Sequence, residues 1–164
     1  MTDLEKFMYH AEEVAKLCKR NNWGDAFSYA RGKEILAAGV LGHQVAQTLA
    51  GPDAFLPDGS PVEYKSTTAK NVRGSYTGIS VQPTWTEQEK YLKEEKIANY
   101  PEHYYNRFED MALVESWMVY GDVVYDITLP KFKAKYPTVL KKKDPRLSAQ
   151  MSTGDIRKYG TRVI

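Results

Sequence analysis

The sequence is poor in the residues that build disulfide frameworks and zinc sites. Its 164 residues include one cysteine, Cys18, and three histidines. A single cysteine excludes an internal disulfide, and no Cys/His spacing typical of a zinc site occurs. We therefore expect a protein of the reducing cytoplasm. Cys18 falls on the apolar face of a predicted helix, which favours a buried small residue over a nucleophile.

Long apolar segments, internal repeats and low-complexity tracts are also absent. No apolar run reaches the length that crosses a membrane, and the charged start Met1–Lys6 lacks a signal-peptide core. We expect neither a membrane span nor a leader. A hydrophobic content of 42% and an aromatic content of 12% are typical of a soluble globular protein. The length favours one domain over residues 1–164.

Charge is distributed unevenly along the chain. Residues 131–164 carry ten Lys/Arg and two Asp/Glu, although the whole chain has a net charge of only +2. A basic segment of this kind raises the local concentration of a polyanion such as nucleic acid. A solvated charged tail is the other interpretation, but apolar residues are interleaved with the charges, which indicates a folded segment.

Apolar periodicity, caps and turn residues predict helices that flank a mixed sheet of five to six strands, an α/β (α+β) fold. A narrow apolar stripe on the first helix can face either the core or a dimer partner. We divide the domain into an N-terminal helix (1–22), a catalytic core (32–129) and a basic C-terminal part (130–164). The expected elements are helices over 3–20, 32–49 and 84–99, a hairpin within 50–68, a strand over 77–82, paired strands over 111–120 and 122–129, a helix through 136, and a strand near 159–164.

A lone aspartate precedes an acid-x-lysine triplet by a distance that fits two strands and a turn. Asp53 is followed by the turn residues Asp58-Gly59 and then by Glu63-Tyr64-Lys65. Side chains alternate along a strand, so Glu63 and Lys65 share a face and Tyr64 points the opposite way. Two carboxylates and one ammonium can thus converge. Without further context, a solvated strand face would look the same.

The chemistry of this set fits metal-assisted phosphodiester hydrolysis. Two carboxylates suit magnesium, which prefers oxygen ligands and keeps several waters. A lysine beside the cation can orient or deprotonate a water. Glu34, near the start of the second helix, is a further candidate ligand, although an acid there also favours the helix dipole. His43 is interpreted as a packing residue rather than a ligand.

A polar segment after the triplet offers groups that suit DNA. Lys70 and Arg73 fit phosphates, and hydroxyl and amide side chains supply the donors and acceptors that base edges require. An ordinary surface loop has the same composition. The candidate DNA-binding residues are Lys70, Arg73, Ser75, Tyr76, Thr77, Ser80, Gln82 and, near the C-terminus, Arg146.

These motifs resemble those of the PD-(D/E)xK nucleases, and among them one branch of the type II restriction endonucleases. Pro52-Asp53 and Glu63-Tyr64-Lys65-Ser66 have that branch's spacing, as does the following Gly74. Other similar stretches are Gly32-Lys33, Asp144-Pro145-Arg146-Leu147 and Gly160-Thr161-Arg162-Val163, so the resemblance covers most of the chain.

The resemblance implies a restriction-endonuclease-like core and cleavage of double-stranded DNA that leaves 5′-phosphate and 3′-hydroxyl ends. Asp53, Glu63 and the carbonyl of Tyr64 would hold Mg²⁺, for which Mn²⁺ can substitute, and Lys65 would act on the water. It also implies a homodimer on a palindromic site, with Leu4, Phe7, Ala11 and Val14 in the dimer seam. A cognate DNA methyltransferase is expected in the host.

The sequence departs from that branch in two places. The branch has an extra acid shortly before the metal aspartate, and residues 48–52 contain none. It also reads DNA through histidines, where this chain has Gly78, Ile79 and Ser80, so a different target sequence is expected. Two alternatives remain open: a structure-selective nuclease of the same superfamily, such as a junction resolvase or phage nuclease, and a DNA-binding protein without catalysis.

Overall fold

A mixed sheet of six strands forms the centre of the computed structural model, which describes residues 1–47 and 50–164. The strand order is β1-β2-β3-β5-β6-β8; β3 pairs with β5 in parallel, and the other neighbours are antiparallel. A second sheet contains β4 and β7. The bounds are β1 Gln44–Val45, β2 Ala54–Phe55, β3 Pro61–Thr67, β4 Gly74–Ser80, β5 Glu102–Glu109, β6 Ala112–Tyr120, β7 Arg146–Met151 and β8 Thr161–Arg162.

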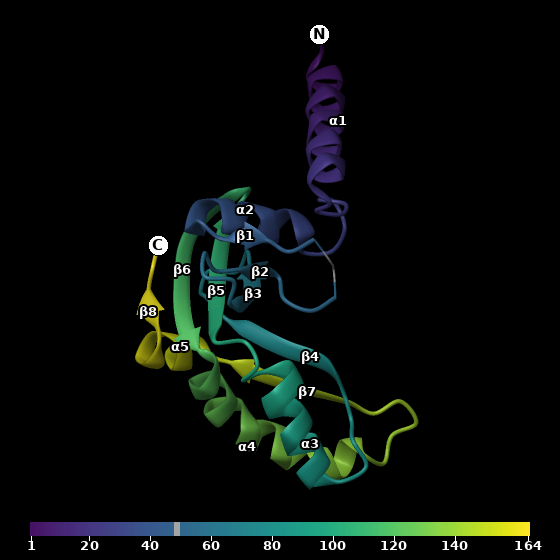
Figure 1. The fold of residues 1–164 in the computed structure, drawn as a ribbon, viewed down its shortest axis with the longest axis vertical. Coiled ribbons are helices and arrows are strands. Elements are labelled where there is room, and N and C mark those ends of the chain that lie inside the picture. Colours follow the sequence, from purple (N-terminus) through teal and green to yellow (C-terminus); the bar gives the residue numbers. More distant parts are fainter. Residues whose placement is uncertain (48–49) are drawn as a thin grey trace.

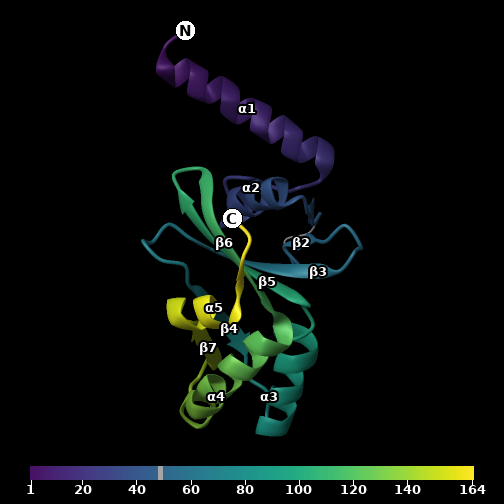
Figure 2. The ribbon, with the colours of Figure 1, turned by 90° about the vertical axis from the view of Figure 1, so that its left-hand side faces the viewer.

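Helices lie at both ends of the larger sheet (Figure 1). Helix α2 crosses one end, α3 and α4 pack near the two-stranded sheet, and α1 projects away from the rest of the chain in both views (Figure 2). This α+β arrangement confirms the predicted class of a mixed sheet flanked by helices. The helices are α1 Asp3–Asn21, α2 Arg31–Leu41, α3 Trp85–Tyr91, the π-helix η1 Leu92–Lys96, α4 Gly121–Val139 and α5 Thr153–Tyr159.

Local caps fix the starts of two helices where the sequence predicts them. In α1 the Thr2 side chain accepts from the Glu5 N–H at 3.3 Å, and Glu5 accepts from the Thr2 N–H at 2.6 Å. The same capping box joins Thr84 and Glu87 at the start of α3. The prediction for residues 3–20 is therefore confirmed, and no described helix is long and apolar enough to cross a membrane.

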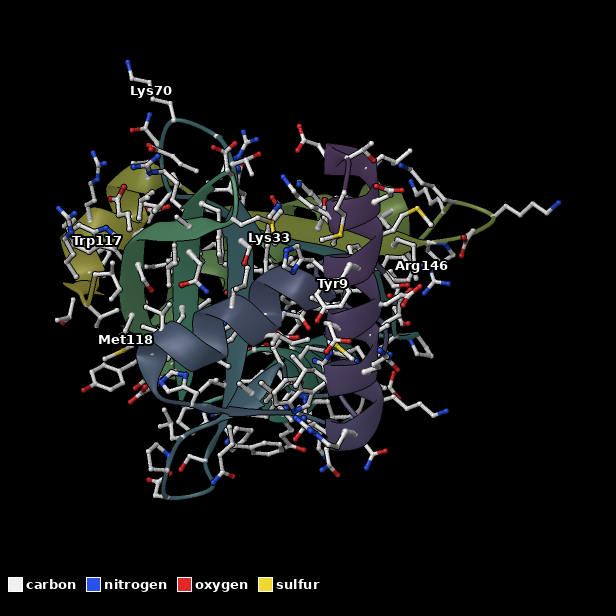
Figure 3. The ribbon with its side chains drawn as sticks, turned by 90° about the horizontal axis from the view of Figure 1, so that it is seen from above. Tyr9, Lys33, Lys70, Trp117, Met118 and Arg146 are labelled. Carbon is white, nitrogen blue, oxygen red and sulfur yellow. The ribbon has the colours of Figure 1, made fainter. Side chains whose placement is uncertain are left out.

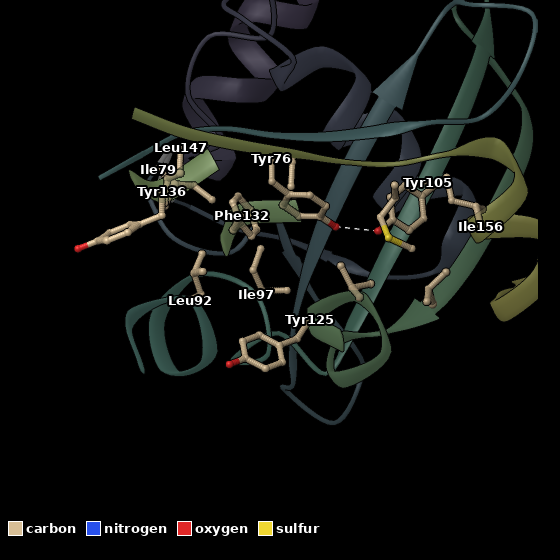
Figure 4. Close-up of a cluster of buried hydrophobic side chains, with 14 of the residues drawn as sticks. Tyr76, Ile79, Leu92, Ile97, Tyr105, Tyr125, Phe132, Tyr136, Leu147 and Ile156 are labelled. Atoms are coloured by element: carbon tan, nitrogen blue, oxygen red, sulfur yellow. Dashed lines mark hydrogen bonds between the residues drawn. The ribbon is translucent and has the colours of Figure 1, made fainter. Parts of the chain in front are cut away.

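Two apolar cores hold the sheets and helices together. The larger core lies between the two-stranded sheet, the larger sheet and helices α3 to α5, and includes Leu92, Phe132 and Ile156, all fully buried (Figure 4). The smaller core packs Ala37 and Ala38 of α2 against β3 and β5. Helix α2 is thereby fixed beside β3, the strand that carries the acid-x-lysine triplet.

The predicted helix over 32–49 is too long. It ends at Leu41 because Gly42 takes a left-handed conformation, with φ of 72°, and caps the helix. Val45 lies in β1 instead of on the helix. The prediction for Leu49 falls outside the described residues.

The predicted strand over 122–129 is wrong, since these residues begin α4. The partner of the strand over 112–120 is β5, and the hairpin turns at Asp110, where φ is 51°. Strand β5 gave no alternating pattern because residues 103–106 are all buried, including the polar His103 and Asn106. Helix α4 continues through Pro130 and Pro137, which would ordinarily mark helix ends.

Candidate active site

A tight turn brings Asp53 beside the acid-x-lysine triplet. The Leu56 N–H donates to the Ser60 carbonyl at 2.9 Å, Asp58 accepts from the Ser60 N–H at 2.8 Å, and Gly59 has a φ of 88°. The predicted turn at Asp58-Gly59 is thus confirmed. It folds β2 back on β3, with Ala54 opposite Val62.

Strand β3 presents the triplet as the two-residue period predicts. Val62 and Tyr64 are buried, whereas the Glu63 and Lys65 side chains are 16% and 22% exposed. Lys65 forms an ion pair with Glu63 along the same strand face. Both side chains therefore reach the solvent from one face of the sheet.

Asp53 immediately precedes β2, at the end of that strand distant from the turn. Its N–H donates to the Val62 carbonyl at 3.1 Å, and its Oδ2 accepts from the Tyr64 N–H at 2.7 Å. This second bond holds the carboxylate against the backbone between Glu63 and Lys65. The structure thus brings Asp53 to the triplet, as the spacing predicts.

Glu34 joins this group from the first turn of α2. Its Oε2 accepts from Arg31 Nη1 at 3.1 Å. Arg31 is only 1% exposed and also donates to the carbonyls of Trp23 and Ala46. Because Ala46 in turn donates its N–H to the Asp53 carbonyl at 3.3 Å, Arg31 ties the start of α2 to the segment that carries Asp53.

The surroundings of Asp53 disfavour the charged form of its carboxyl group. Burial, followed by the charges of Glu63 and Glu34, raises the pKa of the Asp53 carboxyl to about 7. The Tyr64 N–H and Lys65 act in the opposite direction with smaller effects. Three carboxylates and two cations therefore share a partly buried space, and a further positive charge would be favourable there.

This donor set fits a hard divalent cation. Oxygen ligands from two carboxylates suffice for magnesium, which keeps several waters and demands no all-protein cage. Asp53 and Glu63 would hold it, with the Tyr64 carbonyl and Glu34 as further candidates. Within residues 1–47 and 50–164, no cluster of three or more His, Cys, Asp or Glu side chains has the geometry of a ready-made metal site.

Two hollows adjoin the Glu63–Lys65 pair. Glu63 lines an open cleft of about 750 Å³ together with Tyr100 and residues of η1. Lys65 lines a smaller pocket of about 270 Å³, whose wall continues with Ser66, Thr67, Arg73, Gly74 and Ser75. The pair is therefore accessible from solvent, and the smaller pocket is lined by hydroxyls and two cations.

The predicted base contact of Tyr76 is contradicted by its burial. The side chain is 4% exposed, and its hydroxyl lies 2.7 Å from both His103 Nδ1 and the Tyr105 hydroxyl. The strand begins at Gly74 rather than at residue 77, and this register turns Tyr76 inward. The Lys65 ammonium lies 4.9 Å from the centroid of the Tyr76 ring.

The other candidate DNA contacts lie on or near the surface. Ser75 and Thr77 point outward from β4, and Lys70 extends from the edge of the molecule (Figure 3). Arg146 lies far from Lys70 in that view, and donates to Ser80 Oγ at 3.2 Å. The Gln82 backbone is fixed by Gln88 and Tyr136, and its side chain stays half-buried. These residues form no single small patch.

Sequence reasoning missed several residues around the site. His103 and Tyr105 lie on β5, opposite Glu63 and Lys65, and Arg31 lies one turn before Glu34. No motif marks them, because their places depend on strand pairing between distant segments. The interpretation of His43 is confirmed: its Nδ1 lies 2.7 Å from the Tyr64 hydroxyl, on the buried side of β3.

The geometry thus joins the three residues Asp53, Glu63 and Lys65, adds Glu34 and Arg31 beside them, and removes Tyr76 from the exposed surface. No model of a known protein family matches this sequence, and no curated protein matches it.

Proposed function

We propose that this chain is a type II restriction endonuclease that hydrolyses double-stranded DNA with magnesium. The observation that carries the proposal is the convergence of Asp53 and Glu63 beside Lys65, where burial and the neighbouring carboxylates Glu63 and Glu34 raise the pKa of Asp53 to about 7. Like charges in a partly buried site cost stability, and a bound cation would offset that cost.

The roles of the three residues follow from their positions. Asp53 and Glu63 bind the cation, which when bound supplies Lewis-acid stabilisation of the phosphate and a more acidic water. Lys65, paired with Glu63, holds or deprotonates the attacking water and offsets charge in the transition state. Water is the nucleophile, and in-line attack leaves a 5′-phosphate and a 3′-hydroxyl.

The arrangement of elements supports a restriction-endonuclease-like core. The acid-x-lysine strand β3 forms a hairpin with β2 on one side and pairs in parallel with β5 on the other. Helix α2 packs across β3 and carries Glu34 to the site. Strand β2 and helix α2 thereby bring Asp53 and Glu34 to the strand that carries Glu63 and Lys65.

The surface beside the site offers contacts for a DNA backbone. Arg73 and Ser75 line the small pocket next to Lys65, and Lys70 lies exposed in the loop between β3 and β4. Phosphate contacts from such cations position a duplex, whereas outward groups such as Thr77 can read bases. Arg146, Ser80 and Gln82 extend this proposed DNA surface toward β7.

Helix α1 supports the proposed homodimer. Only Cys18 of this helix is buried, and Leu4 and Phe7 are 69% and 65% exposed on its apolar stripe. A second copy of the chain would cover this stripe and place two active sites on opposite strands of a palindromic DNA site. We propose that the protein acts in the cytoplasm of a host whose own DNA is protected by a methyltransferase.

Digestion of long duplex DNA with Mg²⁺, with Mn²⁺ and with EDTA tests this function. We expect discrete fragments with either metal, and a loss of cleavage of at least about 10²-fold in Asp53→Ala and in Lys65→Ala. Asp126→Asn, which removes an exposed acid on α4, is the matched control and should cut normally. Cleavage of branched DNA alone would indicate a structure-selective nuclease, and binding without cleavage a DNA-binding protein.

A further inference from the structure

A chain of hydrogen bonds crosses from the two-stranded sheet to the larger sheet beneath Lys65. The Tyr76 hydroxyl on β4 lies 2.7 Å from the Tyr105 hydroxyl on β5 (Figure 4). It also lies 2.7 Å from His103 Nδ1, on the same strand. His103 Nε2 lies 2.9 Å from the Ile97 carbonyl. All three side chains are buried.

The chemistry of the groups fixes the direction of each bond. A carbonyl only accepts, so His103 Nε2 donates to Ile97. Burial lowers the pKa of His103 to about 4, so the ring is neutral near pH 7 and its Nδ1 accepts from Tyr76. The Tyr76 oxygen then accepts from Tyr105. Each polar side-chain atom of Tyr76, His103 and Tyr105 thus has a hydrogen-bond partner, and these bonds hold the Tyr76 ring in one orientation.

Gly74 makes this crossing possible. A Cβ at position 74 would lie 2.3 Å from the Tyr105 ring and 3.1 Å from the Lys65 Cβ, so any larger residue would push β4 away. The close approach lets Tyr76, two residues later on the same strand face, reach beneath Lys65. The Lys65 ammonium lies 4.9 Å from the centroid of the Tyr76 ring, within cation–π range.

We propose that Tyr76, held by His103 and Tyr105, is a positioning residue that keeps the Lys65 ammonium beside Glu63. The catalytic part of this inference rests on the proposed function. The ammonium also forms an ion pair with Glu63, and a bound cation would compete for that carboxylate. The ring is neutral and binds no magnesium, so its hold on Lys65 persists when the metal and DNA are present.

Two substitutions distinguish the effect of the Tyr76 ring from the effect of its hydroxyl. Tyr76→Leu removes the ring, and we expect kcat to fall about 10-fold, with KM for DNA changed less than about two-fold. Tyr76→Phe keeps the ring but leaves His103 and Tyr105 without their partner. It should lower the melting temperature while kcat stays within about three-fold of the wild type.

A matched control removes volume from the same core without touching Lys65. Phe132→Leu should lower the melting temperature and leave kcat unchanged, because the Tyr76 ring and its hydrogen bonds to His103 and Tyr105 stay in place. If Tyr76→Leu kept full kcat, or if Tyr76→Phe and Tyr76→Leu lost kcat equally, the proposal would be wrong.

A readout that needs no cleavage tests the geometry itself. The ε-CH₂ protons of Lys65, assigned by their loss in Lys65→Arg, should resonate upfield of the other lysines because they face the ring. The shift should persist in Tyr76→Phe and vanish in Tyr76→Leu. An unshifted Lys65 signal in the wild type would overturn the inference. If the wild type cut no DNA, the proposed function would fail while this signal still decided whether Tyr76 holds Lys65.

Discussion

At the scale of single residues, the carboxylate of Asp53 is held where its charge is disfavoured. The folded chain raises the pKa of Asp53 to about 7 through burial and two neighbouring carboxylates. The unfolded chain releases this proton near the ordinary value, so the folded state binds more protons between about pH 4 and pH 7. The contribution of Asp53 to stability therefore falls as the pH rises through that window and is constant above it.

Asp53→Asn should therefore stabilise the metal-free protein at pH 8. Asparagine can still accept from the Tyr64 N–H but carries no charge, so the free energy of unfolding should rise by about 1 kcal/mol. Urea unfolding in EDTA at several pH values measures this. The difference between variant and wild type should grow from about pH 4 to pH 7 and then stay level. The difference isolates Asp53, because the buried His103 and the half-buried His43 are present in both proteins.

Magnesium should reverse the order of stability, so that the wild type becomes more stable than Asp53→Asn. A proton on Asp53 competes with the cation, so Mg²⁺ should raise the melting temperature of the wild type more at pH 8 than at pH 6. It should have little effect on Asp53→Asn. A variant less stable than the wild type at pH 8 in EDTA, or equally stabilised by Mg²⁺, would contradict the assignment of Asp53 as a ligand.

The residues of the site that sequence predicts are those fixed by local geometry. Glu63 and Lys65 share a face because strand alternation needs only the strand itself, and Asp53 is brought back by a turn of five residues, Leu56 to Ser60. Tyr76 was misplaced because its direction depends on where β4 crosses β5. Arg31 could not be predicted, since two of its three partners, the Trp23 and Ala46 carbonyls, lie outside its helix.

At the scale of elements, two helices contain glycines that differ in the space around them: Gly121 is crowded and Gly39 is not. Gly121 begins α4, where a Cβ would lie 1.9 Å from the Tyr100 carbonyl oxygen. Gly39 lies inside α2 with open space around its Cα. The backbone at Tyr100 thus excludes a side chain at position 121, whereas position 39 has room for one.

Alanine at the two positions should have opposite effects on stability. Gly121→Ala must displace α4 from the segment before β5, and we expect the free energy of unfolding to fall by about 2–3 kcal/mol. Gly39→Ala should raise it by about 0.5–1 kcal/mol, because alanine loses less backbone freedom in a helix. Chemical unfolding of both variants measures the difference. Equal effects would show that the close approach at Gly121 does not constrain the fold.

The same contrast explains which elements sequence predicts. Helices α1 and α3 were found because their capping boxes lie within four residues. Strand β5 and the first half of helix α4 were missed because both are fixed by tertiary contacts: β5 is buried on both faces, and α4 packs its start against Tyr100. The second half of α4 agrees with the predicted helix through residue 136. The mixed sheet could be predicted as a class, but its strand pairing could not.

At the scale of the whole molecule, the apolar stripe of α1 and the active site lie in separate parts of the chain. Helix α1 projects away from the rest of the chain (Figures 1 and 2), whereas Asp53 immediately precedes β2 and both Glu63 and Lys65 lie on β3. An apolar helix face exposed to water is unfavourable, and a two-fold partner is the simplest way to cover it. Dimerisation can therefore be disrupted without touching Asp53, Glu63 or Lys65.

The double substitution Leu4→Asp with Phe7→Asp should produce a folded monomer. Both side chains are more than half exposed in one chain, so the charges cost the isolated fold little but would be buried in a dimer. Sedimentation over a range of concentrations should show a dimer for the wild type and a monomer for the aspartate variant. The control, Lys6→Ser with Lys16→Ser, changes the polar side of the same helix and should remain a dimer. Each monomer keeps one site, so the variant should nick one strand of a plasmid where the wild type cuts both. A wild type that sediments as a monomer at all concentrations would refute the dimer.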